Sequence, residues 1–72
     1  GAKIVIGTAV LSGGTVTVTL TNDAVFTSLG TYKVSGSNLS AARAWQHTRI
    51  SGSQIKFDGT GSDQIDFIAV GF

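Results

Sequence analysis

Residues 15–21 read Thr-Val-Thr-Val-Thr-Leu-Thr, an unbroken alternation of threonines with apolar side chains. Successive side chains of a β-strand point to opposite faces of the sheet, so this period of two predicts a strand with one buried face. Further blocks rich in β-branched residues follow along the chain, separated by stretches rich in glycine and serine. This arrangement is typical of short strands joined by turns, and it predicts an all-β fold.

We expect six short antiparallel strands, over residues 3–11, 15–21, 31–34, 43–50, 54–57 and 64–72. The Ser-Gly-Gly sequence between the first two blocks predicts a turn that makes them a hairpin, and residues 35–38 predict a flexible loop. Residues 39–50 also allow a short helix with Ser40 as its N-cap, although we favour a strand there. The expected architecture is a small antiparallel β-sandwich or flattened barrel.

The chain must gain stability from something other than its own core. At 72 residues it is a single domain, and a core of this size rarely supplies more than about 3–5 kcal/mol. It has no cysteine and one histidine, so disulfides and the usual zinc sites are excluded, and we expect no cofactor. Only 12% of its residues are charged and its mean hydropathy is +0.29, which favours oligomerisation as the remaining source of stability.

The last block, residues 64–72, is apolar on both faces. Ile65 and Phe67 point to one face, whereas Ile68, Val70 and Phe72 point to the other. A strand with two apolar faces is covered on both sides, but a two-sheet sandwich buries only one face of each sheet. We therefore predict that these five residues form an oligomer interface and that another copy of the chain supplies the second cover.

Several segments resemble the C-terminal β-modules of bacteriophage tail fibres and tail spikes. They are Ile-Ser-Gly-Ser-Gln-Ile-Lys-Phe at residues 50–57, Gly-Thr-Gly-Ser-Asp at 59–63, Ile-Asp-Phe-Ile-Ala-Val-Gly at 65–71, the segment 12–18 and Tyr-Lys-Val at 32–34. The resemblance covers most of the chain except residues 39–49. It implies a small sandwich that forms a homotrimer at the fibre tip of the virion, stabilises the fibre, and in some cases binds host surface glycans. Invertebrate H-type lectin-like trimers are similar in layout.

Residues 43–50 contain the best candidates for a glycan site. In an extended chain, Arg43, Trp45, His47 and Arg49 project from one face. The indole can stack on a sugar ring while the cations meet its hydroxyls, and the cations also favour acidic glycans. Tyr32 is a further candidate. The alternative is that Trp45 and Tyr32 pack into the core or a subunit interface, as the aromatic residues of a small domain usually do.

The loop at residues 58–63 invites a calcium assignment. Its Gly-Thr-Gly-Ser-Asp sequence partly matches a calcium-binding nonapeptide repeat, with Asp58, Asp63 and Asp66 as the ligands of a metal site. Those sites are shared between successive repeats, and this chain has one copy. We therefore favour a turn in which aspartates bind backbone N–H groups.

Charge and spacing limit the remaining functions. A net charge of +1 gives no strong field for nucleic acid, no apolar run approaches the ~18 residues of a membrane span, and no spacing indicates a catalytic triad. The chain lacks methionine and begins Gly1-Ala2, which we interpret as a cleavage scar before an excised module, residues 3–72.

We thus expect a trimerisation and stabilising cap of a phage tail fibre or spike rather than an enzyme. In this reading the partners are identical copies of the chain and a host cell-surface polysaccharide, which the cap meets outside the cell. Two alternatives stay open. One is a purely structural assembly domain without a ligand, and the other is an accessory domain of a depolymerising spike whose active site lies upstream.

Overall fold

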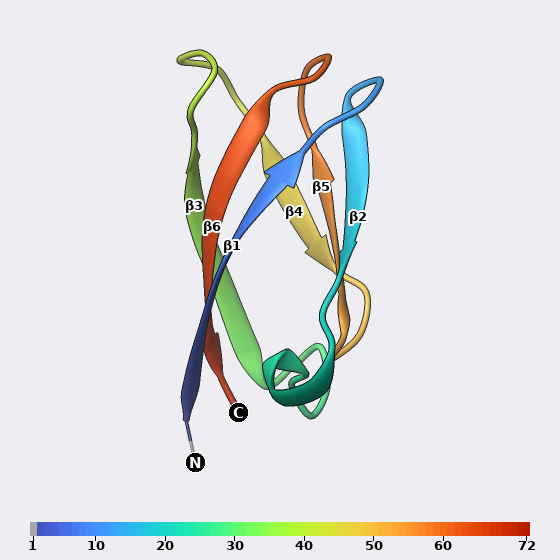
Figure 1. The fold of residues 1–72 in the computed structure, drawn as a ribbon, viewed down its shortest axis with the longest axis vertical. Helices are drawn as coiled ribbons and strands as arrows, with labels where there is room; N and C mark the ends of the chain where they lie inside the picture. Colours follow the sequence, from blue (N-terminus) through green and yellow to red (C-terminus); the bar gives the residue numbers. More distant parts are fainter. Residues whose placement is uncertain (1) are drawn as a thin grey trace.

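The computed structural model describes residues 2–72; Gly1, half of the expected cleavage scar, lies outside the described residues. The chain forms six strands and one short 3-10 helix (Figure 1). In chain order they are β1 (Lys3–Val10), β2 (Thr15–Thr19), η1 (Asn22–Ala24), β3 (Tyr32–Asn38), β4 (Gln46–Arg49), β5 (Gln54–Asp58) and β6 (Gln64–Gly71). Every strand pairing is antiparallel, so the predicted all-β class is confirmed.

The strands form two three-stranded sheets that face each other. The first sheet has the order β1-β6-β3, and the second sheet has the order β2-β5-β4. The β1–β2, β3–β4 and β5–β6 connections each pass from one sheet to the other, and all three gather at the same end of the molecule (Figure 1). We call this end the loop end. β1 begins and β6 ends at the opposite end (Figure 1).

The predicted hairpin between the first two blocks is wrong, because β1 and β2 lie in different sheets. The Ser-Gly-Gly turn carries the chain across the sandwich, and both glycines have positive φ. The backbone next to this turn bonds the β5–β6 connection: Leu11 N donates to Asp63 O and Gly14 N to Gly61 O, both at 2.9 Å. Placing the two blocks in opposite sheets lets their apolar faces bury each other, which a flat hairpin cannot do.

The prediction of a loop at residues 35–38 is also wrong. These residues belong to β3, where Ser35 pairs with Ile68 and Ser37 with Asp66. β3 is an edge strand with an exposed outer face, so serines are acceptable there and the strand carries little apolar alternation. The strand expected near residues 43–50 is confirmed over Gln46–Arg49, and the residues between β3 and β4 form a loop without a helix.

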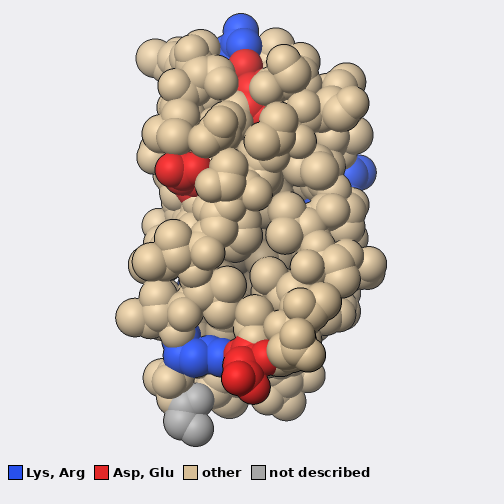
Figure 2. Space-filling view, viewed as in Figure 1, with Lys and Arg blue, Asp and Glu red and all other residues tan. Residues whose placement is uncertain are grey.

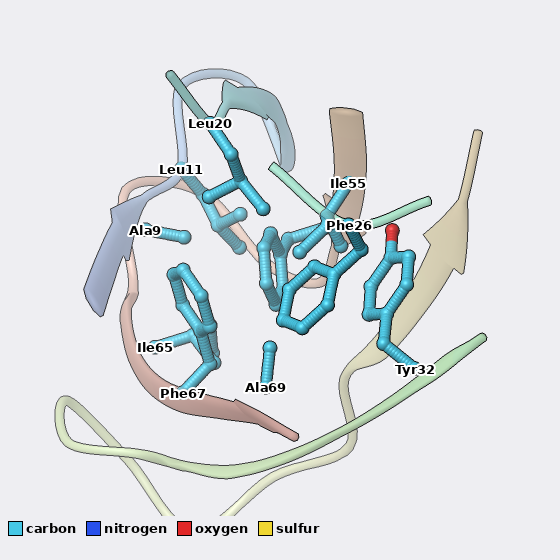
Figure 3. Close-up of a cluster of buried hydrophobic side chains, with 10 residues drawn as sticks. Ala9, Leu11, Leu20, Phe26, Tyr32, Ile55, Ile65, Phe67 and Ala69 are labelled. Atoms are coloured by element: carbon cyan, nitrogen blue, oxygen red, sulfur yellow. The ribbon is translucent and has the colours of Figure 1, made fainter. Parts of the chain in front are cut away.

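The core lies between the two sheets and is dominated by aromatic rings (Figure 3). Phe57 of β5 is fully buried, with its ring centroid 5.0 Å from that of Phe67. Phe26 and Tyr32 stack with ring centroids 4.3 Å apart. The buried apolar residues are Ala9, Leu11, Leu20, Phe26, Tyr32, Ile55, Phe57, Ile65, Phe67 and Ala69.

Candidate functional site

Four aliphatic side chains lie together on the outer face of the first sheet. Ile4 pairs with Val70 and Ile6 pairs with Ile68 across β1 and β6, which places all four on one side. Ile4 and Ile6 are 65% and 79% exposed, and Ile68 and Val70 are 36% and 42% exposed. We call these four residues the apolar face. Charged side chains are sparse on the side of the molecule seen in Figure 2.

The outer face of the second sheet has a different chemistry. Thr15, Thr17 and Thr19 of β2 are exposed there, together with Thr48 of β4 and Lys56 of β5. Polar residues thus alternate with inward-facing apolar residues, as is normal in an antiparallel sheet with one face exposed to solvent. The exposed aliphatic residues of the apolar face are therefore a property of β1 and β6 and not of the fold as a whole.

The five predicted interface residues divide between two environments. Ile65 and Phe67 are 0% and 3% exposed inside this chain's own core, so they have no surface to offer another copy. Ile68 and Val70 belong to the apolar face, and Phe72, which follows β6, is 59% exposed. Of the five predicted interface residues, only Ile68, Val70 and Phe72 are therefore exposed and able to contact another copy.

Ile4 and Ile6 of the apolar face were not among the predicted interface residues. Their signal was present, because residues 3–6 read Lys-Ile-Val-Ile and place apolar side chains on both faces of β1. The same reasoning that singled out the last block applies to this strand.

A polar pair borders the apolar face. Thr8 and Asp66 are opposite each other in the β1–β6 register, and Thr8 Oγ1 donates a 2.9 Å hydrogen bond to Asp66 Oδ1. Ser37 faces Asp66 from β3. The apolar face therefore ends at a hydrogen-bonded boundary toward the loop end.

Three of the five predicted glycan-binding residues alternate along residues 45–49, at the start of β4 and within it, and they are turned toward the interior. Trp45 packs against the core, with its ring centroid 6.1 Å from that of Phe57. His47 pairs with Phe57 and Arg49 with Ile55 in the β4–β5 register. These side chains are half-buried. They cover the flank of the core that lies between β4 and β3.

Tyr32 and Arg49 join the two sheets along this flank. Arg49 Nη1 donates to the Tyr32 carbonyl, and the guanidinium lies over the Tyr32 ring, 5.8 Å from its centroid. Tyr32 is 1% exposed, and its hydroxyl donates a 2.8 Å hydrogen bond to Ser51 O. Burial raises the pKa of Tyr32, partly opposed by Arg49. Both side chains are thus already committed to contacts within the chain.

His47 is held neutral by its surroundings. Burial is the larger cause that lowers its pKa, and the positive charge of Arg49 adds to it. A neutral imidazole near pH 7 is a hydrogen-bonding group rather than a cation. This argues against His47 as a charged partner for an acidic sugar.

Arg43 lies in the β3–β4 loop and binds Asp63. Its Nε donates to Asp63 Oδ2 at 2.6 Å, Nη2 contacts Oδ1, and Asn38 Nδ2 donates to Oδ2 at 2.9 Å. Asp63 is only 4% exposed, and the hydrogen bonds from Arg43 and Asn38 lower its pKa to about 2. Arg43, which was predicted to bind a glycan, therefore holds the β3–β4 loop on the β5–β6 connection.

A shallow pocket of about 270 Å³ opens at the loop end beside Trp45. Trp45 and Ala44 come from the β3–β4 loop, and Gly59 comes from the β5–β6 connection. Gln46 and Asp58, which are opposite each other in the β4–β5 register, complete the lining. The pocket therefore brings Trp45 together with two polar residues that were not predicted to lie beside it.

The three aspartates of the calcium alternative do not come together. Asp63 pairs with Arg43, Asp66 accepts from Thr8 on the first sheet, and Asp58 lies 3.8 Å from Lys56 on the second. Among residues 2–72, no three His, Cys, Asp or Glu side chains gather as a metal site requires. The loop does form a turn, in which Asp63 N donates to Thr60 O. The expected contacts of its aspartates with backbone N–H groups are wrong, because their carboxylates contact side chains instead.

Comparisons of the chain with protein families, with curated proteins and with solved structures find no match. In the part of the chain that the structure describes, no helix has the length and hydrophobicity to cross a membrane. The apolar face and the pocket beside Trp45 are therefore the two features of this chain that bear on its function.

Proposed function

We propose that the chain is an assembly module of a bacteriophage tail fibre or tail spike, in which identical copies cover each other's apolar face. The observation that carries this proposal is the set of four exposed aliphatic side chains at paired positions of β1 and β6. The resemblance to fibre-tip modules favours a homotrimer. In a three-fold arrangement, each copy turns the same face toward the axis, so that apolar surface meets apolar surface.

Burial of the apolar face contributes a large share of the stability of a domain of this size. Full burial of an exposed valine or isoleucine contributes roughly 1.5–3 kcal/mol, and the four side chains retain between 36% and 79% of their surface. The contribution of each copy is therefore several kcal/mol, which is comparable to the ~3–5 kcal/mol that a core of this size supplies. Assembly and folding stability are expected to be coupled.

The arrangement of the connections supports a cap. β1 begins and β6 ends at one end of the sandwich, and three of the four sheet-to-sheet connections lie at the other (Figure 1). In a parallel trimer, all loop ends point in the same direction. Such an assembly presents one surface, made of loops, away from the point where the chains enter.

The test compares two lysine substitutions that add the same charge. Ile6→Lys places it in the centre of the apolar face, whereas Thr15→Lys places it on the outer face of the second sheet, opposite Asp58. We expect light scattering to give a lower mass for Ile6→Lys than for Thr15→Lys, whose mass should match that of the wild type, with circular dichroism showing both folded. Equal masses for the two variants would contradict the proposal.

Glycan binding is a second candidate function, and the pocket at the loop end favours it. Trp45 offers a stacking surface, while Gln46 and Asp58 offer hydrogen-bonding groups beside it. Because Arg43 pairs with Asp63 and Arg49 with the Tyr32 carbonyl, the cations predicted to select acidic glycans are occupied. We therefore propose neutral sugars of a host surface polysaccharide as the ligand class.

Trp45 is the chain's single tryptophan, so its fluorescence reports directly on this pocket. Titration with neutral oligosaccharides is expected to shift the emission of the wild type. Asp58→Asn should weaken the effect, and Asp23→Asn, on exposed η1, should leave it unchanged. A response to acidic sugars alone contradicts the assignment, and no response to any sugar favours the purely structural alternative.

A further inference from the structure

β2 is an edge strand with open backbone hydrogen-bonding groups. It pairs with β5 on one side only. Leu20 N donates to Ser53 O and Gly14 N to Gly61 O, which shows that even-numbered residues turn their backbone groups toward β5 and its flanking turns. Thr15 turns the other way and exchanges hydrogen bonds with Ser12. By the alternation of an antiparallel strand, the N–H and C=O groups of Thr17 and Thr19 therefore point to the open edge.

This edge lacks the features that normally prevent strand pairing. Natural edge strands are protected by charged side chains, proline or bulges, and glycine weakens a strand. In the described chain, β1 contains Lys3 and Gly7, β3 contains Lys33 and Gly36, and β4 contains Arg49. β2 reads Thr-Val-Thr-Val-Thr and contains none of these.

We propose that β2 pairs with β2 of a second copy, antiparallel and about a two-fold axis through Val18. In this register Thr17 of one copy lies opposite Thr19 of the other. The N–H and C=O groups of both residues, four open groups in each chain, then all form hydrogen bonds with the second copy. A register centred on Thr17 would instead place Thr19 opposite Thr15, whose backbone already bonds Ser12. The open groups thus select one register.

The side chains are compatible with the same register. Val18 lies opposite Val18 of the second copy, and Val16 lies opposite Leu20, so the inner face of the sheet continues as apolar surface. Thr17 and Thr19 form cross-strand pairs on the outer face, a favourable combination in antiparallel sheets. Because the donors, acceptors and side chains of β2 are complementary to those of an antiparallel β2, the partner that fits this edge is a second copy of the chain. This edge belongs to the second sheet, whereas the apolar face belongs to the first.

Single cysteines test the register directly, because the chain has none of its own. Val18 on the two-fold axis forms a non-hydrogen-bonded pair, for which the Cα–Cα distance is about 4.5 Å and allows a disulfide. Two copies of Thr17 are diagonal neighbours, roughly 7–8 Å apart. Under mild oxidation, Val18→Cys is expected to give a disulfide dimer on a denaturing gel at least tenfold faster than Thr17→Cys. Thr17 is the more exposed residue, so random collision gives the opposite order, and that result would overturn the proposal.

A second pair of variants tests the backbone contribution. In the Val18→Cys background, Thr17→Pro removes an outward donor and should slow cross-linking about tenfold, while Thr17→Val should leave the rate unchanged. Circular dichroism selects the folded variants.

Adding Ile6→Lys to Val18→Cys separates this contact from the apolar face. Persistent cross-linking shows that the β2 edge pairs independently. Loss of cross-linking means that the edge pairing is only a consequence of the other interface and contradicts the proposal.

Discussion

Ile6 and Ile68 lie directly opposite each other on the outer face of the first sheet, where 79% of the Ile6 surface and 36% of the Ile68 surface are exposed. Their neighbours along the same strands, Ala9 and Ala69, are buried on the inner face. β1 and β6 are therefore apolar on both sides, and this chain covers one side only. Burial of the other side by further copies is the simplest physical explanation for a surface of this composition.

Phe57 is the central side chain of the core, so its truncation should be severe. It is fully buried between Trp45 and Phe67, and phenylalanine-to-alanine changes at such sites cost about 3–5 kcal/mol. This equals the whole stability expected of a core this small. We expect Phe57→Ala to be unfolded in urea titrations followed by circular dichroism. Leu39→Ala, at a residue 56% exposed, should unfold like the wild type; similar curves for the two variants would contradict the description of the core.

Acid should release the β3–β4 loop through Asp63. Its pKa is lowered from 3.8 to about 2 by hydrogen bonds from Arg43 and Asn38, so the folded state binds the proton less readily than the unfolded state. The stabilisation is therefore complete above about pH 4 and is lost as the pH falls from 3.8 toward 2. Urea unfolding between pH 5 and pH 2 should show this loss in the wild type.

The matched variant for this experiment is Asp63→Asn, which removes the titrating group. It should be less stable than the wild type at pH 5, and the difference between the two proteins should shrink toward pH 2. His47 adds a loss of its own below pH 6.5, because its pKa is lowered in the folded state and the unfolded chain therefore takes up the proton first. This loss is common to both proteins and cancels in their difference. A constant difference between Asp63→Asn and wild type across this range would refute the role of the Arg43 pair.

Gly52 should tolerate no side chain. It is buried at the β4–β5 turn, and a methyl group there would lie 2.8 Å from the carbonyl carbon of Phe26 and 3.2 Å from Ser28 N. These are backbone atoms that cannot rotate away, so Gly52→Ala is expected to cost at least the ~1–3 kcal/mol typical of overpacking. At Gly30 the nearest atom is 3.9 Å away, which makes Gly30→Ala the control. Equal thermal midpoints for the two variants would show that the turn can move.

Local patterns predicted the strands well and their partners poorly. The alternation of Val16, Val18 and Leu20 and the glycine-rich separators place all six strands within a few residues of their observed positions. Strand pairing depends on which apolar faces can bury each other across the sandwich, and a turn sequence such as Ser-Gly-Gly serves a hairpin and a sheet-to-sheet connection equally well. Edge strands such as β3 are also hard to recognise, because an exposed outer face removes the apolar alternation.

The candidate site could be predicted in composition but not in orientation. The spacing of Trp45, His47 and Arg49 correctly places them on one face, yet spacing alone does not say whether that face is exposed to solvent or buried. The contacts of Arg43 with Asp63 and of Arg49 with Tyr32 join residues 17 or more positions apart, and no local pattern encodes them. Gln46 follows Trp45 directly in the sequence, whereas Asp58 gains its place near Trp45 only through the β4–β5 register.

The molar mass of the wild-type chain in solution, measured by light scattering over a dilution series, tests the central claim most directly. Mutual burial of the apolar face predicts a mass of two or more chains of 7.4 kDa each that falls only at high dilution. The proposed trimer predicts three chains, or a multiple of three where the β2 edges also pair. A folded chain of 7.4 kDa at every concentration, with Ile6 and Ile68 in water, would contradict the claim.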